Sequence, residues 1–468
     1  MVRDFRDGLA KIVGATHVLM GAEAAQFEGD WRGRYRARAL AVVRPANTAE
    51  IAAVVSLCRE WRVPVVPQGG NTGLCGGSVP VVDDSAIVLS LGRLNRIRGV
   101  DPLDASLCAE AGCTLAQVQA AAEGIGQLFP LSLASEGSCE IGGNISTNAG
   151  GVHVLRYGTM RDLVLGLEVV LPDGRIWDGL RRLRKDNTGY DLKQLYIGAE
   201  GTLGVVTAAT LKLFPQPKSR AVAWIGLPDI AAAQSLFTVL KQRFGERLMA
   251  FELIGEAALE LVVRHIPGAH RPLPAHQGWA VLVELTDSQA DVDLVALMEG
   301  ILGEGVAAGW AADAVIAQSL AQAKTLWGLR ENISEAQKIE GVSIKHDISV
   351  PISRIVQFLG EADVALRNRS SGVRIVVFGH FGDGNLHYNL SMTDDAENAR
   401  FLLTADDMTR IVHDLVAAHG GSISAEHGIG QLKRADLRRY KSAVELEMMT
   451  KVKAALDPEG LMNPGKLL

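Results

Sequence analysis

The chain has 468 residues, of which 48% are hydrophobic and 21% are charged, and its formal net charge is −6. Because a single hydrophobic core stops growing at about 250–300 residues, this length predicts two or more domains. The weakly acidic balance excludes the broad basic surface that nucleic-acid binding needs. A small anionic ligand would therefore be held by local cationic side chains.

The N-terminal segment mixes charged and apolar residues and lacks the uninterrupted apolar core of a signal peptide. No other stretch approaches the ~20 apolar residues of a transmembrane helix. The five cysteines lie within residues 58–139, at spacings that fit no common zinc motif. We therefore expect a cytoplasmic protein with reduced thiols and no transmembrane segment.

The first half of the chain alternates short β-like runs with helical patterns. The β-like runs cover residues 63–66, 86–89 and 165–171, and the helical patterns cover residues 48–59 and 115–123. Strands that alternate with helices in this way predict an α/β domain.

A proline-flanked segment at residues 214–218 predicts a domain boundary, after which the helical patterns become longer. This part of the chain predicts a second, α+β domain. Its expected elements are helices over 231–243, 291–302 and 317–338, and strands over 279–285 and 374–378. A charged helix beyond residue 430 leads to a turn rich in proline and glycine at residues 456–466.

Residues 67–77 form a loop that holds five glycines in nine positions, and it follows a β-like run. Glycine permits close backbone approach, so consecutive N–H groups can converge on an anion. The loop matches neither the P-loop nor the dinucleotide fingerprint, and it predicts a pyrophosphate cradle of another type. Two further segments, 130–151 and 196–207, are rich in small and amide residues that suit a flat polar ring system.

The C-terminal half holds a cluster of histidines in glycine-rich turns. A β-run delivers His380, a turn at residues 382–384 follows, and His387 opens the returning strand. Glu426 and His427 stand at a second β-to-glycine turn. Two imidazoles and one carboxylate suit a catalytic divalent metal, with Zn²⁺ first and Mn²⁺, Fe²⁺ or Co²⁺ as alternatives. Adjacent residues on an extended backbone point opposite ways, so one member of the Glu-His pair can bind the metal and the other act as a base.

Arg330 and Ser334 share one face of a helix expected over residues 327–334. The guanidinium of Arg330 offers a planar fork for a carboxylate, which a lysine cannot match. A strand of alternating character follows at residues 342–351 and carries Lys345.

Three segments in this order, 67–77, 142–151 with Arg156-Tyr157-Gly158, and 198–207, resemble the FAD-binding domain of the vanillyl-alcohol oxidase / p-cresol methylhydroxylase superfamily. The resemblance covers about residues 35–215 and implies FAD, which we expect to be non-covalent because the first loop has no histidine. The FAD contacts that it implies are Pro67, Gly69, Gly70, Asn71, Thr72, Gly73, Leu74, Ser138, Gly142, Gly143, Asn148, Gly151, Tyr157, Glu200, Gly201, Gly204 and Val206. Asn463, in the C-terminal segment discussed next, is a further expected FAD contact.

The histidine segments and residues 456–466 are similar to the C-terminal domain of FAD-linked oxidases, which occurs in D-lactate dehydrogenases, glycolate oxidase flavoprotein subunits and D-2-hydroxyglutarate dehydrogenases. Both resemblances together imply an α+β protein. A two-subdomain α/β FAD-binding domain of the p-cresol methylhydroxylase type would cover residues 1–218. A substrate domain with an antiparallel sheet covered by helices would cover residues 219–427, and residues 428–468 would return to the flavin domain.

The second resemblance also implies roles for individual residues. His380, His387 and Glu426 would hold the metal, and His427 would be the base that takes the hydroxyl proton while hydride passes to flavin N5. The substrate would be contacted by Asn389 and His427, and its distal carboxylate by Arg330, Ser334 and Lys345. The family has a threonine at the position of Ser334, and the serine keeps the hydroxyl.

The sequence thus predicts an FAD-dependent dehydrogenase that converts a D-2-hydroxy acid to the 2-keto acid. Lys345 favours a dicarboxylate such as D-2-hydroxyglutarate or D-malate over the alternatives D-lactate and glycolate. An O₂-using alcohol oxidase and a non-catalytic flavoprotein subunit are further alternatives. The electron acceptor would be an electron-transfer flavoprotein, a quinone or a cytochrome, and hydrophobic helices of the second domain suggest a homodimer.

Overall fold

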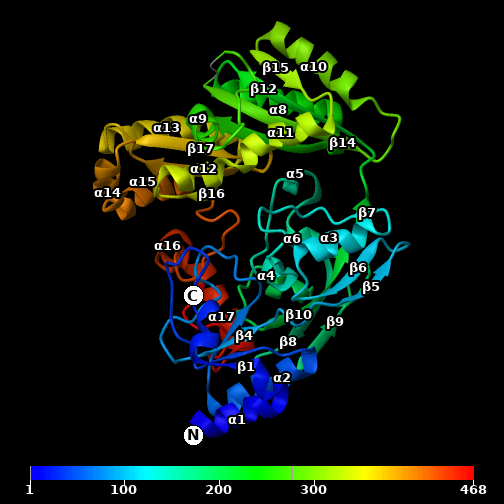
Figure 1. Cartoon of the computed structure of the whole chain (residues 1–468), viewed down its shortest axis with the longest axis vertical. Coiled ribbons are helices and arrows are strands. Elements are labelled where there is room, and N and C mark those ends of the chain that lie inside the picture. The colour runs from blue at the N-terminus through cyan, green and yellow to red at the C-terminus, as the bar shows by residue number, and fades with distance from the viewer. Residues whose placement is uncertain (1, 276–277) are drawn as a thin grey trace. The chain divides into compact units, whose positions relative to one another are not determined.

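The computed structural model describes residues 2–275 and 278–468 (Figure 1). The contacts between residues divide the chain into two compact units. Unit 1 consists of Met1–Gly151, Tyr157–Gln216 and Glu426–Leu468, and unit 2 of Val152–Arg156 and Pro217–Ala425. The chain therefore leaves unit 1, builds unit 2, and returns to unit 1 for its last residues.

The first part of unit 1 is a four-stranded sheet with the order β1-β2-β4-β3, in which β2, β4 and β3 run parallel. Buried side chains of the first two helices, among them Phe5, Leu9 and Ile51, pack in one cluster with Val65 and Leu89 of the sheet. The elements are α1 (Val2–Val13), η1 (Ala15–His17), β1 (Val18–Leu19), η2 (Gly21–Glu23), η3 (Ala25–Phe27), β2 (Ala41–Val43), α2 (Thr48–Trp61), β3 (Val65–Gln68) and β4 (Ile87–Ser90).

The second part of unit 1 is a five-stranded antiparallel sheet with the order β5-β6-β10-β8-β9. Its central strands are buried almost throughout. The elements are β5 (Ile97–Asp101), β6 (Ser106–Glu110), α3 (Leu115–Glu123), β7 (Gln127–Leu128), α4 (Ile141–Ser146), α6 (Met160–Leu163), β8 (Val164–Val170), β9 (Ile176–Gly179), α7 (Lys193–Tyr196), β10 (Val205–Lys212), β11 (Phe214–Pro215), α16 (Arg434–Tyr440) and α17 (Ala443–Leu456). The short helix α5 (Val154–Tyr157) begins in the segment that belongs to unit 2 and ends in unit 1.

Unit 2 is a seven-stranded antiparallel sheet with the order β15-β12-β14-β13-β17-β18-β16. The elements are β12 (Ser219–Leu227), α8 (Ile230–Phe244), η4 (Gly245–Arg247), β13 (Leu248–Gly255), α9 (Glu256–His265), β14 (Trp279–Asp287), α10 (Leu294–Ala308), β15 (Asp313–Ile316), α11 (Leu320–Glu331), α12 (Ile333–Glu340), β16 (Asp347–Ser349), η5 (Ile352–Arg354), α13 (Ile355–Arg369), β17 (Arg374–His380), η6 (Phe381–Asp383), β18 (Asn385–Ser391), α14 (Asp395–Leu402) and α15 (Ala405–Ala418).

Helices pack on both faces of this sheet. Because successive side chains of a strand point to opposite faces, each strand contributes to the packing on both sides. On one face, Ala250 and Ile254 of β13 pack in a cluster with Leu259 of α9 and Trp327 of α11. On the other face, Phe251 lies against Phe237 of α8, with ring centroids 5.2 Å apart. Glu252 stands between Ala250 and Ile254 in the sequence and so shares their face.

Most expected elements are present, but the long helix expected over residues 317–338 is wrong. The chain forms two helices there, α11 and α12, which meet at Asn332. Asn332 has φ −81° and ψ 0°, and its side chain donates a hydrogen bond to the carbonyl of Gly328. Arg330 and Ser334 were expected to lie on one face of a continuous helix. This expectation is wrong, because the helix breaks between them and Arg330 is buried while Ser334 is exposed.

Candidate active site

Unit 1 contains an open cavity, about 890 Å³ when the adjoining solvent space is included, that is lined by the three segments singled out in the sequence. The expected FAD contacts that line it are Pro67, Gly69, Gly70, Asn71, Thr72, Gly73, Leu74, Gly142, Gly143, Glu200, Gly201, Gly204 and Val206.

The first loop keeps its shape through close backbone contacts and side-chain hydrogen bonds. A side chain at Gly70 would place its Cβ 1.8 Å from the carbonyl oxygen of Ser138, so only glycine fits. Asn71 adopts a left-handed φ of 53°, and its Oδ1 accepts a hydrogen bond of 2.6 Å from Ser78. Gln68 closes the base of the loop by donating to the carbonyls of Phe27 and Ser78. The main chain is therefore presented to the cavity without intervening side chains at Gly69 and Gly70.

Glu140 also lines the cavity and was not expected from the sequence. Burial raises the pKa of its carboxyl to about 8, and its Oε2 has no hydrogen-bond partner among the described residues. Burial favours the neutral form of this carboxyl, which can donate a hydrogen bond. The orphaned oxygen and the glycine cradle both fit a polar ligand such as FAD.

The C-terminal segment completes this cavity from within unit 1. The Glu200 carboxylate accepts hydrogen bonds from the backbone N–H groups of Ile429 and Gly430, both at 2.7 Å. Burial raises the pKa of Glu200 despite these two hydrogen bonds. The anchored segment brings His427 to the wall of the cavity.

Five of the expected FAD contacts do not line the cavity. Ser138 donates to the carbonyl of Ser135, and Asn148 accepts from the backbone of Arg161. The remaining three are Gly151, whose Cβ would lie 2.0 Å from the Ser132 oxygen, Tyr157, which packs on Phe214, and Asn463, which donates to Gly77 and Glu200. The buried Oδ1 of Asn463 accepts no hydrogen bond from the part of the chain that the structure describes, so this side chain still has an unused acceptor.

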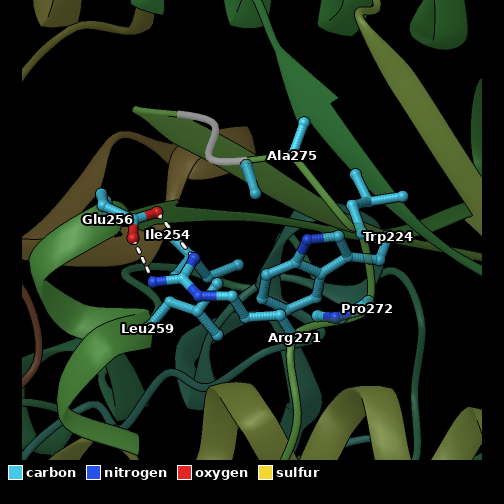
Figure 2. A pocket seen from close by; sticks show the side chains of 10 residues that line it. Trp224, Ile254, Glu256, Leu259, Arg271, Pro272 and Ala275 are labelled. Atoms are coloured by element: carbon cyan, nitrogen blue, oxygen red, sulfur yellow. Dashed lines mark hydrogen bonds and ion pairs between the residues drawn. The ribbon is translucent and has the colours of Figure 1, made fainter. Parts of the chain in front are cut away.

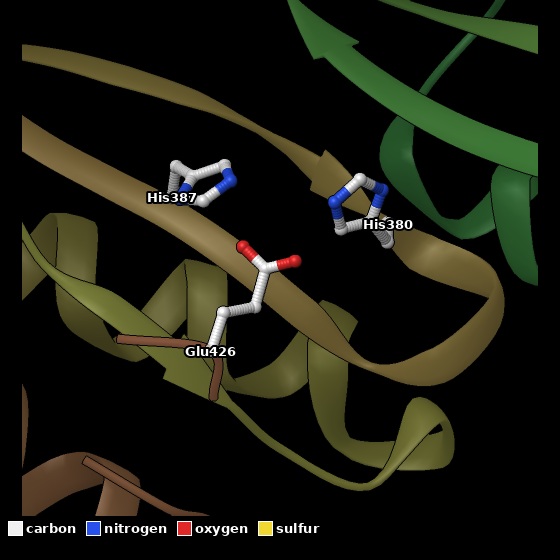
Figure 3. A group of neighbouring side chains, drawn as sticks. All are labelled: His380, His387 and Glu426. Atoms are coloured by element: carbon white, nitrogen blue, oxygen red, sulfur yellow. The ribbon is translucent and has the colours of Figure 1, made fainter. Parts of the chain in front are cut away.

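Three possible metal ligands come from β17, from β18 and from the segment that follows Ala425. His380 ends β17 and His387 lies on the adjacent strand β18, where it pairs with Phe378. Glu426 directly follows Ala425, the last residue of unit 2. One ligand atom from each of these three residues lies within 4.8 Å of the others, and Figure 3 shows the three side chains turned toward one another. The donor set of two imidazoles and one carboxylate fits a divalent metal with open coordination positions.

The hairpin that holds the two histidines has the expected form, with a turn at η6 between two paired strands. The β-run expected before Glu426 is absent, because residues 423–427 form no strand and the nearest pairing is the isolated bridge between Ser349 and Ser422. Glu426 is therefore placed by an irregular segment.

Glu252 is the residue that the sequence reasoning missed in this region. It lies on β13 opposite His380 and is 1% exposed. Burial would raise the pKa of its carboxyl, but His380 and Arg330 together hold it at about 2. No motif marks Glu252, since it stands in an ordinary apolar strand 128 residues before His380.

The expected substrate contacts in unit 2 have different surroundings. Arg330 is buried on α11, whereas Ser334 and Lys345 are exposed. Lys345 precedes the short strand β16, so the long strand expected over residues 342–351 is wrong. Asn389 is buried on β18, where its Nδ2 donates to Gln337 and its Oδ1 accepts from the backbone of His346. One N–H of the Asn389 amide remains for a ligand.

A separate small hollow lies elsewhere in unit 2 (Figure 2). The guanidinium of Arg271 lies against the carboxylate of Glu256, and Trp224 and Leu259 supply apolar walls. The ion pair already satisfies the charged groups, and we assign no ligand to this hollow.

Comparison with known proteins assigns the chain to a family. The sequence pattern of "FAD linked oxidases, C-terminal domain" matches residues 216–467, and that of "FAD binding domain" matches residues 39–179. The chain belongs to the FAD-linked oxidases. The resemblance noted in the sequence is thereby confirmed, and so is FAD as the cofactor of the first domain.

Two relatives of this FAD-linked oxidase illustrate how far the similarity extends. The chain is 40% identical over 441 residues to the probable D-2-hydroxyglutarate dehydrogenase, mitochondrial, of Oryza sativa subsp. indica, covering 94% of this chain and 77% of the relative. It is 39% identical to the D-2-hydroxyglutarate dehydrogenase of Xanthomonas citri pv. viticola, covering 95% of this chain and 93% of the relative.

The crystal structure of p-cresol methylhydroxylase with substrate bound shares the fold, with a TM-score of 0.77, 17% sequence identity, and coverage of 99% of this chain and 96% of that chain. The α+β fold of the p-cresol methylhydroxylase type is therefore as predicted. Within the residues that the structure describes, every helix is too short or too polar to cross a membrane.

Proposed function

We propose that this FAD-linked oxidase converts a D-2-hydroxy acid to the corresponding 2-keto acid and that its preferred substrate is D-2-hydroxyglutarate. The oxidation removes two electrons and two protons from the substrate. FAD would supply the hydride acceptor, held by the glycine cradle and the anchored C-terminal segment. The names of relatives at 38–40% identity, which are D-2-hydroxyglutarate dehydrogenases, support this substrate.

The observation that carries the reaction type is the convergence of His380, His387 and Glu426. We propose that these residues hold a divalent metal, Zn²⁺ before Mn²⁺, which would polarise a bound hydroxyl and lower its pKa. The next residue, His427, would accept the hydroxyl proton, because imidazole is half-protonated near neutral pH and suits this exchange.

We propose that the substrate is held through both of its ends. Asn389 has one N–H left for a ligand oxygen, and Arg330 presents a guanidinium fixed by a buried partner. Ser334 and Lys345 are further contacts for the distal carboxylate in this proposal. A distal carboxylate between cationic groups would distinguish a dicarboxylate from D-lactate or glycolate.

The proposal includes an external electron acceptor, which would be an electron-transfer flavoprotein, a quinone or a cytochrome. It also includes a homodimer, which the exposed apolar residues Leu297 and Val306 on α10 support. We further propose a cytoplasmic location, although the rice relative is named mitochondrial. The five cysteines, all free of disulfides, are consistent with a reducing compartment.

Anaerobic bleaching of the flavin absorbance tests the proposal directly. We expect D-2-hydroxyglutarate to bleach the flavin fastest among the D- and L-forms of 2-hydroxyglutarate, malate and lactate, with glycolate included. Rapid bleaching by D-lactate and none by the dicarboxylates would show that the substrate is D-lactate and not D-2-hydroxyglutarate. A flavin that no hydroxy acid reduces would contradict the reaction itself, and fast reoxidation by air would favour an oxidase.

A further inference from the structure

The carboxylate of Glu252 joins two parts of unit 2 to which the proposed function gives separate roles. Its Oε1 lies 2.7 Å from Nδ1 of His380, and its Oε2 accepts a hydrogen bond of 2.7 Å from Nε of Arg330. Glu252 is 1% exposed, so water does not compete for these contacts. One buried side chain therefore contacts a proposed metal ligand and a proposed substrate-binding cation.

The contact with His380 decides which ring nitrogen can bind a metal. A carboxylate accepts a hydrogen bond but cannot donate one, so the Nδ1 atom of His380 must carry the proton that it shares with Glu252. The lone pair of the neutral ring is then on Nε2, the nitrogen on the far side of the ring from Glu252. A partner of this kind fixes the tautomer and the orientation of a metal-binding histidine.

The contact with Arg330 decides which of its donors remain for a ligand. Nε is occupied by Glu252, and the guanidinium lies over the ring of Phe378, 4.9 Å from the ring centroid. Both contacts hold the plane of the guanidinium, and its terminal N–H groups remain for a carboxylate. Arg330 is 8% exposed, so this orientation is set by the protein interior.

From these contacts we propose that Glu252 is a positioning residue that orients the metal ligand His380 and the carboxylate-binding Arg330 at the same time. The inference rests on the proposed function and deepens it, because it explains how one side chain orients both the metal ligand and the arginine that binds the distal carboxylate. In this proposal Glu252 contacts neither the metal nor the distal carboxylate of the substrate, and it acts through His380 and Arg330.

The amide of a glutamine cannot replace this carboxylate, although it has the same size. Both partners donate hydrogen bonds, and an amide has only one oxygen to accept them. The charged guanidinium is the stronger donor, so we expect the amide oxygen to face Arg330. The NH₂ group would then face His380 and move its proton to Nε2, where it blocks metal binding.

The test measures metal affinity as well as activity. We expect Glu252→Gln to weaken Zn²⁺ binding by about 10- to 100-fold, measured by competition with a chromophoric chelator, while the FAD absorbance spectrum is unchanged. Unchanged Zn²⁺ affinity in this variant would overturn the inference. If the wild-type protein itself binds no Zn²⁺, the proposed metal site fails instead, so the two failures are distinguishable.

A second substitution separates positioning from a general loss of structure. In the double variant Glu252→Gln with Arg330→Met, the amide oxygen is free to accept from His380, so Zn²⁺ affinity should return to within about threefold of wild type. The preference for D-2-hydroxyglutarate over D-lactate, measured as the ratio of kcat/KM values, should be lost in the double variant, because the guanidinium of Arg330 is absent. Failure of Zn²⁺ affinity to recover in the double variant would also overturn the inference.

Glu284 provides a matched control on the neighbouring strand β14. It is also a buried carboxylate with two donors, accepting at 2.6 Å from both Trp327 and Arg220. Glu284→Gln should cost stability without changing Zn²⁺ affinity. If Glu252→Gln does not fold, ¹⁵N spectra of histidine-labelled, metal-free wild-type protein decide the question. A proton on Nδ1 of His380 supports the inference, and an Nε2–H tautomer overturns it.

Discussion

Two adjacent residues of the C-terminal segment have different surroundings. Glu426 groups with His380 and His387, whereas His427 lines the cavity formed by the flavin-binding loops. A ligand atom of Glu426 and one of His427 also lie within 4.8 Å of each other, so the two neighbours can serve the same reaction. We propose His427 as the base because it lines the cavity of the flavin-binding loops.

Replacement of the proposed base should abolish chemistry and leave the cofactor in place. We expect His427→Ala to lower the rate of flavin reduction by D-2-hydroxyglutarate by about 10²- to 10⁴-fold, the usual contribution of a general base. Stopped-flow absorbance of the loaded enzyme measures this rate. His419→Ala is the control, because the His419 ring contacts Glu361 and Phe358 instead. Wild-type reduction rates in His427→Ala would exclude the role of base.

The first glycine-rich loop shows how an element can depend on single positions. Gly70 has no room for a Cβ, while a Cβ at Gly73 would meet no other atom within 4 Å. Both glycines line the same cavity. The loop therefore tolerates a side chain at one position and not at the other.

This difference predicts contrasting effects of two alanine substitutions. Gly70→Ala must displace the Ser138 carbonyl, so we expect apoprotein stability to fall by about 1–3 kcal/mol, the range for overpacked sites. The protein should also be purified with little FAD. Gly73→Ala should leave apoprotein stability within about 0.5 kcal/mol. Chemical denaturation of the two apoproteins provides the comparison, and equal stabilities would contradict the described loop geometry.

At the scale of the whole molecule, each unit contains a different part of the proposed chemistry. The FAD cavity is lined by residues of unit 1, and both proposed histidine ligands belong to unit 2. The chain supplies Glu426 and His427 where it passes from unit 2 back to unit 1. Cofactor binding and metal binding should therefore be separable.

Metal removal tests this separation. Treatment with EDTA followed by desalting should abolish turnover of D-2-hydroxyglutarate without releasing FAD. The reason is that none of the three proposed metal ligands lines the FAD cavity. Addition of Zn²⁺ or Mn²⁺ should restore the rate. Assays of turnover and of flavin absorbance on the same sample measure both effects. Turnover that resists chelation would remove the metal from the proposed reaction.

The local sequence determined the features that depend on short-range physics. Helices such as α2 and α3 follow from capping residues and apolar periodicity, and the β17–β18 hairpin follows from a glycine turn between apolar runs. The glycine-rich loops indicated the flavin cradle because close backbone approach needs glycine wherever it occurs. The family resemblance, which the comparisons confirm, supplied the cofactor and the fold.

Only the tertiary structure decided which distant side chains meet. Glu252 stands in an apolar strand without a motif, and its two contacts exist only because β13 pairs with β17 and α11 packs over the sheet. Glu140 likewise acquires its raised pKa from burial that no local pattern encodes. Such contacts depend on long-range pairing, where the partner of a charged group is set by the fold and not by its neighbours in sequence.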